Sequence, residues 1–142
     1  MAEDKLHLQV ITMTEIVYDK MVSIVDLRLE NGYIGIMPGS EPLLGSVVDG
    51  PLKCIHDGKK EYLYVGAGIL EVNNNNVNLL VNAAELAEEI DPIRVTGALE
   101  RANAVLKEDL TPIERETALA DKLRAEARIK TYNIYTYQSD IL

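Results

Sequence analysis

The first part of the chain, up to about Ala84, repeats its apolar residues at every second position. The pattern is clearest at Leu6–Val10 and at Val77–Val81. Successive side chains of a strand point to opposite faces of a sheet, so this period predicts strands with one buried face. Shorter segments of the same kind lie at Met21–Leu29, Tyr33–Met37, Pro51–Ile55, Glu61–Val65 and Gly68–Val72. The expected fold of this part is an all-β antiparallel sandwich or flattened barrel.

Two polar segments between these strands predict tight turns. Asn73–Asn76 separates two apolar segments, and Asn tolerates positive φ, so we expect a hairpin tip there. Asp57-Gly58-Lys59 predicts a second hairpin turn for the same reason. Gly66 and Gly68 are better explained by close strand packing or a bulge than by phosphate binding.

After Asn82 the period changes to that of a helix. Asp91 followed by Pro92 predicts a helix start, because the Asp side chain accepts the first free N–H groups and Pro at the first position loses no hydrogen bond. The expected apolar stripe recurs at spacings of three and four, at Val95, Ala98, Leu99, Ala102, Val105 and Leu106. Thr96 and Gly97 lower the helix propensity of this segment.

A second helix is predicted from Thr111, because Thr111-Pro112-Ile113-Glu114 has Thr at the N-cap and Glu three residues later. Its expected stripe comprises Ile113, Ala120, Leu123, Ala127 and Ile134. The short linker at residues 107–110 makes the two helices antiparallel neighbours. Two helices cannot enclose a core, so the hairpin has to dock on the sandwich or on another protein.

This organisation divides the chain into a β-sandwich domain at residues 1–86 and a helical hairpin domain with a C-terminal tail at residues 87–142. The tail, Tyr132–Leu142, has a composition rich in β-formers. Two alternatives are open for it: extension of the second helix, or docking as an apolar latch.

Composition narrows the classes of partner. The formal net charge of −9 opposes attraction to nucleic acid and to anionic lipid, and the absence of Phe and Trp leaves few aromatic rings for base stacking. The single cysteine, Cys54, excludes an internal disulfide and fits a buried thiol in a reducing compartment. No apolar run is long enough to cross a bilayer, so we expect a soluble, cytoplasmic chain without direct bilayer insertion.

The candidate chemistry lies in four arginines of the helical part. Arg94 and Arg101 are seven residues apart on one helix face, and Arg124 and Arg128 are four apart on another. The guanidinium fork suits phosphate oxygens, and the like-charged pair at Arg124 and Arg128 favours a nearby anion. The alternative is a solvated face or ordinary ion pairs, such as Asp121 with Arg124.

Catalytic and metal-binding motifs are missing from the sequence. It contains no P-loop, dinucleotide fingerprint, nucleophile elbow or paired metal-ligand motif. Neither His7 nor His56 lies in an acid–base–nucleophile pattern. We expect no metal site, no required cofactor and no autonomous catalysis.

Two segments carry a resemblance to a known family. Tyr33-Ile-Gly-Ile-Met-Pro-Gly-Ser-Glu-Pro-Leu-Leu44 resembles a G-x-x-G-I-x-P-G-H-x-P-L-L pattern, and Val65-Gly-Ala-Gly-Ile-Leu-Glu-Val72 resembles a G-G-x-[IL]-E-V pattern. Followed by a helical hairpin, they resemble the epsilon subunit of bacterial F-type ATP synthase over roughly residues 5 to 130. Ala67 stands where the family usually has Gly, so the backbone there does not require positive φ.

The resemblance implies a noncatalytic rotor subunit that couples ion flow to ATP synthesis at the cytoplasmic face of the bacterial cell membrane. The implied partners are the gamma subunit and the c-ring, with the alpha and beta subunits added when the hairpin extends and inhibits ATP hydrolysis. Candidate rotor contacts are Tyr33, Gly35 and Ser40. Tyr33 and Ser40 replace an acidic residue and a His that are frequent in the family, so the contacts of relatives do not transfer directly to them.

Some bacterial members bind ATP in the folded hairpin through an [IL]-D-x-x-R-A motif. This chain presents Ile90-Asp91-Pro92-Ile93-Arg94-Val95, with Val95 in place of Ala. By position, the resemblance adds four further candidates: Glu85, Arg101, Arg124 and Arg128. For Asp91 the N-cap role is compatible with ligand binding, and for Glu85 a plain surface position is the alternative.

A second interpretation is a freestanding nucleotide-binding β-sandwich module with a helical lid. A partner surface would distinguish the two interpretations. A stalk subunit has to bury an exposed apolar surface of its sandwich against a coiled coil.

Overall fold

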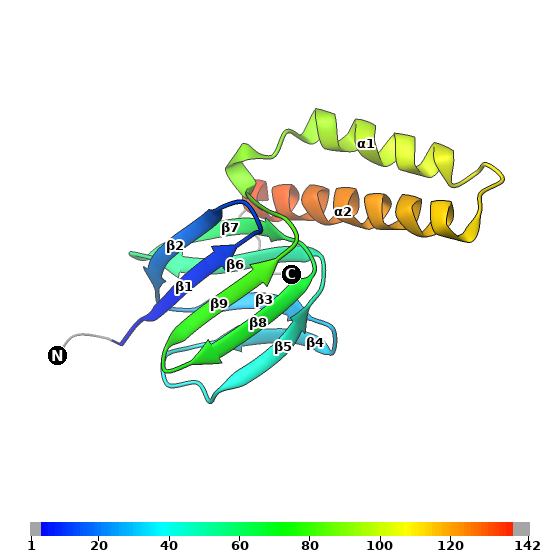
Figure 1. The fold of residues 1–142 in the computed structure, drawn as a ribbon. Helices are drawn as coiled ribbons and strands as arrows, with labels where there is room; N and C mark the ends of the chain where they lie inside the picture. The colour runs from blue at the N-terminus through cyan, green and yellow to red at the C-terminus, as the bar shows by residue number, and fades with distance from the viewer. Residues whose placement is uncertain (1–3, 138–142) are drawn as a thin grey trace.

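The computed structural model describes residues 4–137, which form a β-sandwich with a helical hairpin at one end (Figure 1). The strands are β1 (Leu6–Ile11), β2 (Ile16–Val22), β3 (Val25–Leu29), β4 (Gly32–Ile36), β5 (Leu43–Val47), β6 (Gly50–His56), β7 (Lys59–Val65), β8 (Gly68–Asn73), β9 (Asn76–Val81) and β10 (Ala84–Leu86). A single 3-10 turn, η1 (Ala87–Glu89), leads into the helices α1 (Pro92–Val105) and α2 (Pro112–Tyr137).

The strands form one curled sheet in the order β10-β7-β6-β3-β5-β8-β9-β1-β2, with β4 paired to β3. The sheet folds over so that β2, at one end, lies against β6 and β10 near the other end. Ladders between consecutive strands are antiparallel, whereas β1 pairs with β9 in parallel, Leu8 opposite Val77. The predicted sandwich or flattened barrel is confirmed, and this parallel pair is an addition that the prediction lacked.

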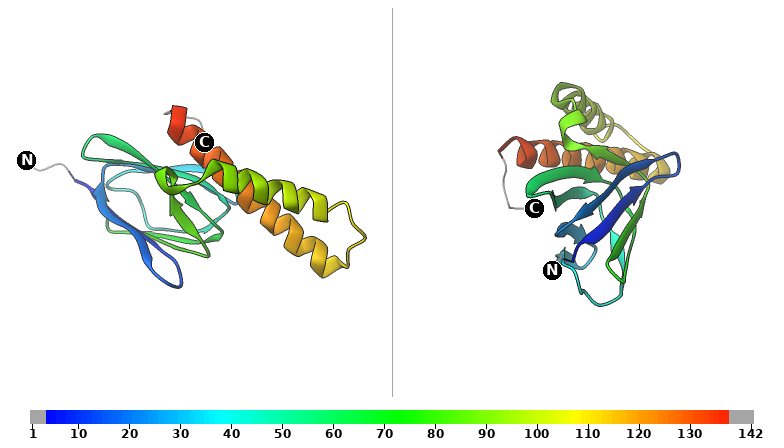
Figure 2. Two further views of the ribbon diagram at one scale, coloured as in Figure 1. Left: turned by 90° about the horizontal axis from the view of Figure 1, so that it is seen from above. Right: turned by 90° about the vertical axis from the view of Figure 1, so that its left-hand side faces the viewer.

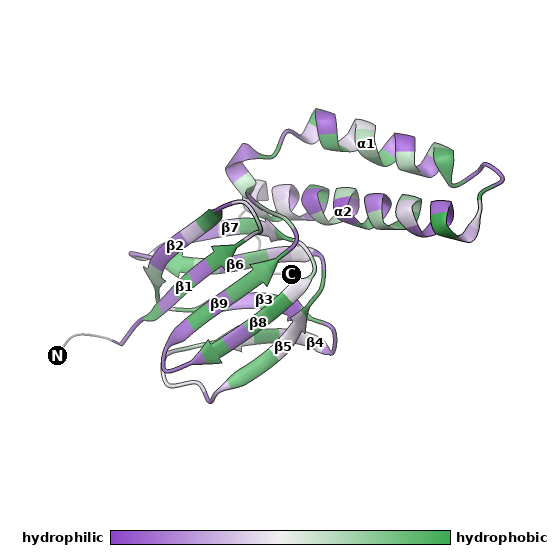
Figure 3. Cartoon of the chain, in the orientation of Figure 1, coloured by the Kyte–Doolittle hydropathy of each residue, from purple (hydrophilic) through white to green (hydrophobic). Residues whose placement is uncertain are grey.

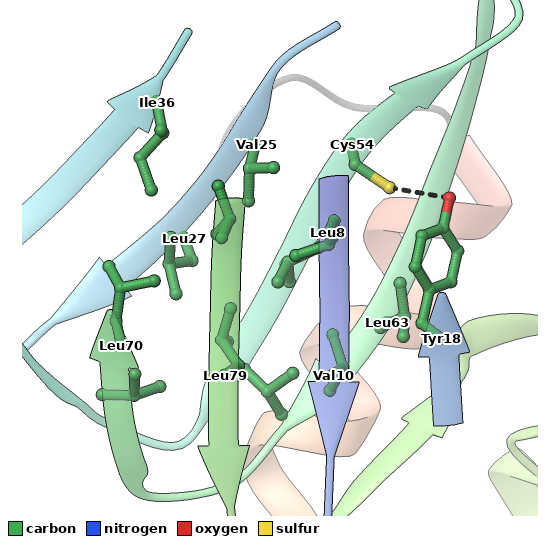
Figure 4. Packing of buried hydrophobic residues seen from close by; sticks show 14 of the residues in the cluster. Leu8, Val10, Tyr18, Val25, Leu27, Ile36, Cys54, Leu63, Leu70 and Leu79 are labelled. Carbon is green, nitrogen blue, oxygen red and sulfur yellow. Dashed lines mark hydrogen bonds between the residues drawn. The ribbon is translucent and has the colours of Figure 1, made fainter. Parts of the chain in front are cut away.

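The core lies between the two layers and consists almost wholly of aliphatic side chains (Figure 4). Alternate residues of β1, Leu6, Leu8 and Val10, are fully buried, as the period of two predicts. Cys54 is buried in the same cluster, its Sγ donates to the Tyr18 hydroxyl at 3.3 Å, and burial raises the pKa of its thiol to about 11. The thiol is therefore neutral and inert at physiological pH.

A polar contact joins β2 to the opposite layer of the sandwich. The Tyr18 hydroxyl donates to Glu61 Oε1 at 2.7 Å, and Lys20 Nζ donates to the same carboxylate at 3.2 Å. Burial alone would raise the pKa of Glu61, but these two donors outweigh it and lower that pKa. Glu61 therefore remains ionised, and it fastens β2 to β7 where no backbone ladder joins them.

One predicted strand was wrong in its bounds, and the strands β5 and β10 were missed. Met21–Leu29 is not one strand: β2 ends at Val22, and the chain bends at Ser23 to start β3, because the two strands pair with different neighbours. The strand β5 was missed because Gly45 interrupts its alternation of apolar residues. The structure explains this glycine: a Cβ at position 45 would lie 2.9 Å from Leu29 Cδ1. The three-residue β10 is too short to produce a period.

The predicted turns and glycine positions are confirmed. Asp57 and Gly58 have φ of 49° and 77°, and Asn74 and Asn75 have φ of 50° and 62°. Gly68 faces the backbone of β9, where a Cβ would lie 2.0 Å from the Leu80 carbonyl oxygen, so close strand packing explains this glycine. Ala67 has no positive φ, as expected.

Both predicted helix starts are confirmed. Asp91 Oδ1 accepts from the N–H groups of Ile93 and Arg94 at 3.0 and 3.3 Å. At α2 the Thr111 hydroxyl accepts from the Glu114 N–H at 3.2 Å and donates to the Glu114 carboxylate at 2.9 Å, so the capping pair closes through its side chains. The two helices run antiparallel beyond the edge of the sandwich (Figure 2).

The predicted apolar stripe of α2 was partly wrong. Ile113 and Leu123 are exposed, and the buried residues of α2 are Ala118, Ala125, Ala127, Thr131 and Ile134. The seam between the helices therefore consists of small side chains that apolar size alone does not mark. The stripe of α1 is closer to the prediction, with Val95 and Ala102 buried.

The C-terminal part of α2 holds the hairpin on the sandwich. This helix packs on β6, β7 and η1. Ile134 is buried with Tyr62 and Ala87, and the Tyr135 ring meets Tyr62 edge to face with centroids 6.2 Å apart. The described part of the tail therefore both extends α2 to Tyr137 and docks on β7, so the two alternatives hold together; residues 138–142 lie outside the described residues.

We expect Ile134→Ala to loosen the hairpin without unfolding the sandwich. Removing a buried Ile side chain costs roughly 2–5 kcal/mol, here taken mainly from docking of α2. Hydrogen exchange should become faster in α1 and α2 and stay slow in β1 and β9. Ile113→Ala, at an exposed position of the same helix, is the matched control. Equal protection of α2 in both variants would contradict the assignment of docking to this residue.

Candidate functional site

A cleft of about 780 Å³ lies along the hairpin, between α1 and α2, and reaches the sandwich at β10. Its lining combines four arginines, five carboxylates and a set of mostly small apolar side chains: Glu85, Glu89, Asp91, Arg94, Val95, Ala98, Arg101, Ala102, Val105, Ile113, Glu114, Thr117, Ala118, Asp121, Arg124, Ala125 and Arg128. The two helices thus supply almost the whole wall.

The structure brings seven of the eight predicted site residues to this one cleft: Glu85, Asp91, Arg94, Val95, Arg101, Arg124 and Arg128. Ile90 is the exception. Its side chain is buried beneath the cleft in a cluster with Tyr64, Val95, Ala125 and Ala127. Ile90 therefore supports the wall and does not face the opening.

Arg128 is the most constrained of the four arginines. Its Nε donates to Glu85 Oε1 at 3.2 Å, and its guanidinium carbon lies 4.4 Å from the centroid of the Tyr64 ring. Both partners belong to the sandwich, Glu85 on β10 and Tyr64 on β7, whereas Arg128 belongs to α2. Glu85 is therefore half-buried in an ion pair, and the alternative of a plain surface residue does not describe it.

The other three arginines differ in their partners. Arg124 pairs with Asp121 one turn earlier on α2, as the ion-pair alternative anticipated; the Arg124 side chain is partly exposed and that of Asp121 is exposed. Arg94 and Arg101 make no ion pair with any residue in the range 4–137. Two unpaired positive charges on α1 therefore face two paired charges on α2 across the cleft.

Tyr64 lies directly beneath this arrangement and is fully buried. Its hydroxyl has no hydrogen-bond partner among the described residues. Burial, with Asp49 adding to it, raises the pKa of Tyr64 to about 12, so the ring stays neutral and presents an intact π face to Arg128.

Sequence reasoning missed the apolar half of the lining and three of its carboxylates. Ala98, Ala102, Ala118 and Ala125 line the cleft because they form the seam between the helices. The available signal was the recurrence of Ala at spacings of four and seven on the two helices. Glu114 and Asp121 were noted in the sequence for other roles, the helix cap and the ion pair with Arg124, and Glu89 carried no signal that separates it from other surface acids.

The three candidate rotor-contact residues lie together at β4 and the loop after it, at the end of the sandwich away from the hairpin (Figure 1). Tyr33 is exposed and its ring lies under the Arg28 guanidinium. Gly35 lies opposite Asp26, where a Cβ would meet Asp26 Oδ1 at 2.9 Å. Ser40 Oγ donates to the Met37 carbonyl at 2.6 Å, which closes the loop on itself.

Within residues 4–137 no three His, Cys, Asp or Glu side chains are grouped closely enough to hold a metal ion. Among the same residues, no helix has the length and apolar character that a membrane span needs.

Comparison with known proteins places the chain in one family. Residues 5–87 match the family described as "ATP synthase, Delta/Epsilon chain, beta-sandwich domain". The ATP synthase epsilon chain of Solibacter usitatus (strain Ellin6076) is 38% identical over 128 residues, which cover 90% of this chain and 96% of the relative. That of Caldicellulosiruptor saccharolyticus is 38% identical over 126 residues, covering 89% and 92%.

Solved structures share the whole architecture at low identity. A chain in the mitochondrial ATP synthase of Euglena gracilis has a TM-score of 0.69 at 21% identity, covering 94% of this chain and 81% of its own length. A chain in the Tetrahymena thermophila central stalk and c-ring structure has a TM-score of 0.62 at 16% identity, covering 93% and 99%. These two likenesses show the fold.

A β-sandwich with a helical hairpin docked on it, matched by epsilon chains over nearly the full length, defines an accessory subunit of the rotor of F-type ATP synthase. The chain belongs to the ATP synthase epsilon chain family.

Proposed function

We propose that the hairpin cleft binds ATP and that ATP holds the hairpin in its docked form, which restrains the inhibition of ATP hydrolysis by the extended hairpin. The observation that carries this proposal is the gathering of four arginines from two helices around one cleft. The protein performs no chemistry on the nucleotide, and ATP acts as a regulatory ligand.

The cleft has the features that a nucleotide requires. The guanidinium groups of Arg94 and Arg101 are free to bind phosphate oxygens, and those of Arg124 and Arg128 face them from α2. The alanine-lined wall between the helices offers an apolar surface for a flat base. Val95 belongs to the cleft lining and is also buried in the cluster with Tyr64 and Ile90, so it forms part of the apolar wall.

Regulation follows from mass action. A ligand that binds the docked hairpin and not the extended one stabilises the docked form by about 2.7 kcal/mol when its concentration is a hundredfold above Kd. Docking of α2 relies on two apolar clusters, one around Tyr64 and one around Tyr62, and the free energy of ligand binding adds to theirs in favour of the docked form. The extended form would then prevail when ATP falls.

The partner surface that we propose for the gamma subunit is a row of apolar side chains on the outer face of the sandwich. Register places Ile69, Leu80, Ile11 and Ile16 side by side across β8, β9, β1 and β2. Ile69, Leu80 and Ile16 are 51%, 55% and 56% exposed, and Figure 3 shows the apolar character of β8 and β9. We call these four residues the apolar row.

An exposed row of this kind fits a subunit that is covered in its assembly. A freestanding nucleotide-binding module would have no use for the apolar row, so the row favours the stalk interpretation. We further propose that Tyr33, Gly35 and Ser40, in the β4 region, contact the c-ring. The extended hairpin would contact the alpha and beta subunits. The subunit would lie at the cytoplasmic face of the bacterial membrane.

Calorimetry with ATP tests the ligand proposal. We expect saturable 1:1 binding to the full chain and a loss of about 10- to 100-fold in affinity for Arg94→Ala and for the Arg124→Ala, Arg128→Ala double variant, because a charge-assisted hydrogen bond contributes roughly 1.5–3 kcal/mol. Arg115→Ala, on α2 but outside the cleft lining, is the matched control. Absence of heat and of thermal stabilisation at millimolar ATP would reject the proposal.

Asp121→Asn should strengthen ATP binding. Asp121 forms an ion pair with Arg124, and a phosphate that binds Arg124 has to compete with this carboxylate. Exposed ion pairs contribute roughly 0.2–1 kcal/mol, so we expect a gain of up to about fivefold in affinity. Glu116→Gln, an exposed acid of the same helix outside the cleft lining, should leave affinity unchanged. Weaker binding by Asp121→Asn would show that Asp121 contacts the ligand favourably.

Leu80→Glu tests the partner surface. A charge in the middle of the apolar row should weaken binding to the purified gamma subunit by at least about tenfold, because its carboxylate would be buried without a partner. The stability of the isolated chain should change by no more than about 0.5 kcal/mol, since Leu80 faces solvent. Leu123→Glu, equally exposed but on α2, serves as the control. Unchanged affinity for gamma would place the interface elsewhere.

A further inference from the structure

The junction between the sandwich and the hairpin contains a buried aromatic residue that faces an arginine of the cleft. Tyr64 lies on β7 and is fully buried, and its ring supports the guanidinium of Arg128 at 4.4 Å. Tyr64 does not itself line the cleft. Tyr64 shares a cluster with two apolar residues of the lining, Val95 and Ala125, and Arg128 is its one charged contact among the lining residues.

Two contacts fix the orientation of the Arg128 guanidinium. Stacking on Tyr64 covers one face of the plane, and the hydrogen bond to Glu85 engages the Nε edge. The two terminal nitrogens, Nη1 and Nη2, have no partner among the described residues. A guanidinium binds phosphate through a pair of parallel N–H groups, and the Nη1/Nη2 edge supplies such a pair.

The other arginines lack this support. Arg124 is held by Asp121 through a terminal nitrogen, so its outer edge is occupied, and Arg94 and Arg101 are exposed and unpaired within residues 4–137. Ordering a long side chain on binding costs entropy, which a pre-oriented group has already lost. Arg128 is thus the arginine whose geometry is set before a ligand arrives.

We propose that Tyr64 is a positioning residue that, with Glu85, holds Arg128 with its terminal N–H groups presented to the cleft for a nucleotide phosphate. This inference rests on the proposed nucleotide function and deepens it. Since Tyr64 and Glu85 belong to the sandwich and Arg128 to α2, a phosphate bound to Arg128 also reinforces the attachment of the hairpin. Ligand binding and hairpin docking then share one side chain.

The test combines a spectroscopic signature with a mutant cycle. In the ligand-free wild type, the Nε–H resonance of Arg128, assigned by its loss in Arg128→Lys, should be dispersed and protected from exchange. Tyr64→Phe keeps the ring and should retain both this signal and ATP affinity. Tyr64→Leu should move the signal to the position of free arginine and weaken ATP binding by about tenfold, as expected for a partly desolvated cation–π contact.

Tyr62→Leu is the matched control, because Tyr62 is buried on the same strand at the same docking interface but contacts Tyr135. It should leave the Arg128 signal in place. In an Arg128→Lys background, Tyr64→Leu should cost less than a further twofold in ATP affinity, whereas Tyr62→Leu should keep its full effect.

The outcomes separate this inference from the proposed function. A wild type that binds no ATP rejects the nucleotide site, and the Arg128 signal alone then decides whether Tyr64 positions the guanidinium. An Arg128 signal that is already free in the wild type, or that survives Tyr64→Leu, overturns the inference even if ATP binds. Should Tyr64→Leu fail to fold, Tyr64→Met takes its place, because it also removes the ring and its flexible side chain fills an irregular space.

Discussion

The structure depends on the docking of the C-terminal part of α2 against β6 and β7. The hairpin has no core of its own, since the residues between its helices are chiefly alanines, and α1 packs mainly on α2. Apolar burial on the sandwich by Ile134, with Tyr135 against Tyr62, supplies what the hairpin lacks. The sandwich has a large aliphatic core of its own, to which no residue of α1 or α2 contributes.

The cleft lies in the hairpin, the part of the molecule without a core of its own, and a ligand bound there would therefore affect how firmly the hairpin is docked. The cleft lies in the weakly held part of the molecule and touches the strongly held part through Glu85 and Arg128. Segments that move during regulation are generally those with a low free energy of local unfolding. Under the proposed function, an anion bound in the cleft would act on the docking equilibrium and leave the sandwich, with its proposed partner surface, unchanged.

Much of this architecture could be predicted from local sequence. The caps at Asp91 and Thr111 and the turns at Asp57 and Asn74 depend on contacts within a few residues, so their types reveal them. The bend at Ser23 and the parallel pairing of β1 with β9 depend on which strands meet across the fold, and no local pattern encodes that choice.

In the candidate site, too, the features set by local spacing could be predicted, and the contacts between distant segments could not. Helix spacing, together with the family resemblance, was enough to bring four arginines into one set, because both helices are regular and run antiparallel. The pairing of Arg128 with Glu85 joins residues 43 positions apart, and the support from Tyr64 comes from a different strand again. Such contacts become visible when the sandwich places β7, β10 and α2 side by side. The position of Ile90 outside the cleft lining could not be predicted, because a motif position does not state which way its side chain points.

The small side chains of the interhelical seam explain both the weakness of the hairpin and the presence of the cleft. Leu or Ile at Ala98, Ala102, Ala118 and Ala125 would fill the space between α1 and α2 and would bind the helices together by several kcal/mol. The same substitution would remove the volume that a ligand needs. The alanines provide little apolar contact between α1 and α2. Under the proposed function, an anion held by arginines of both helices would supply an additional interaction between them and so stabilise the hairpin.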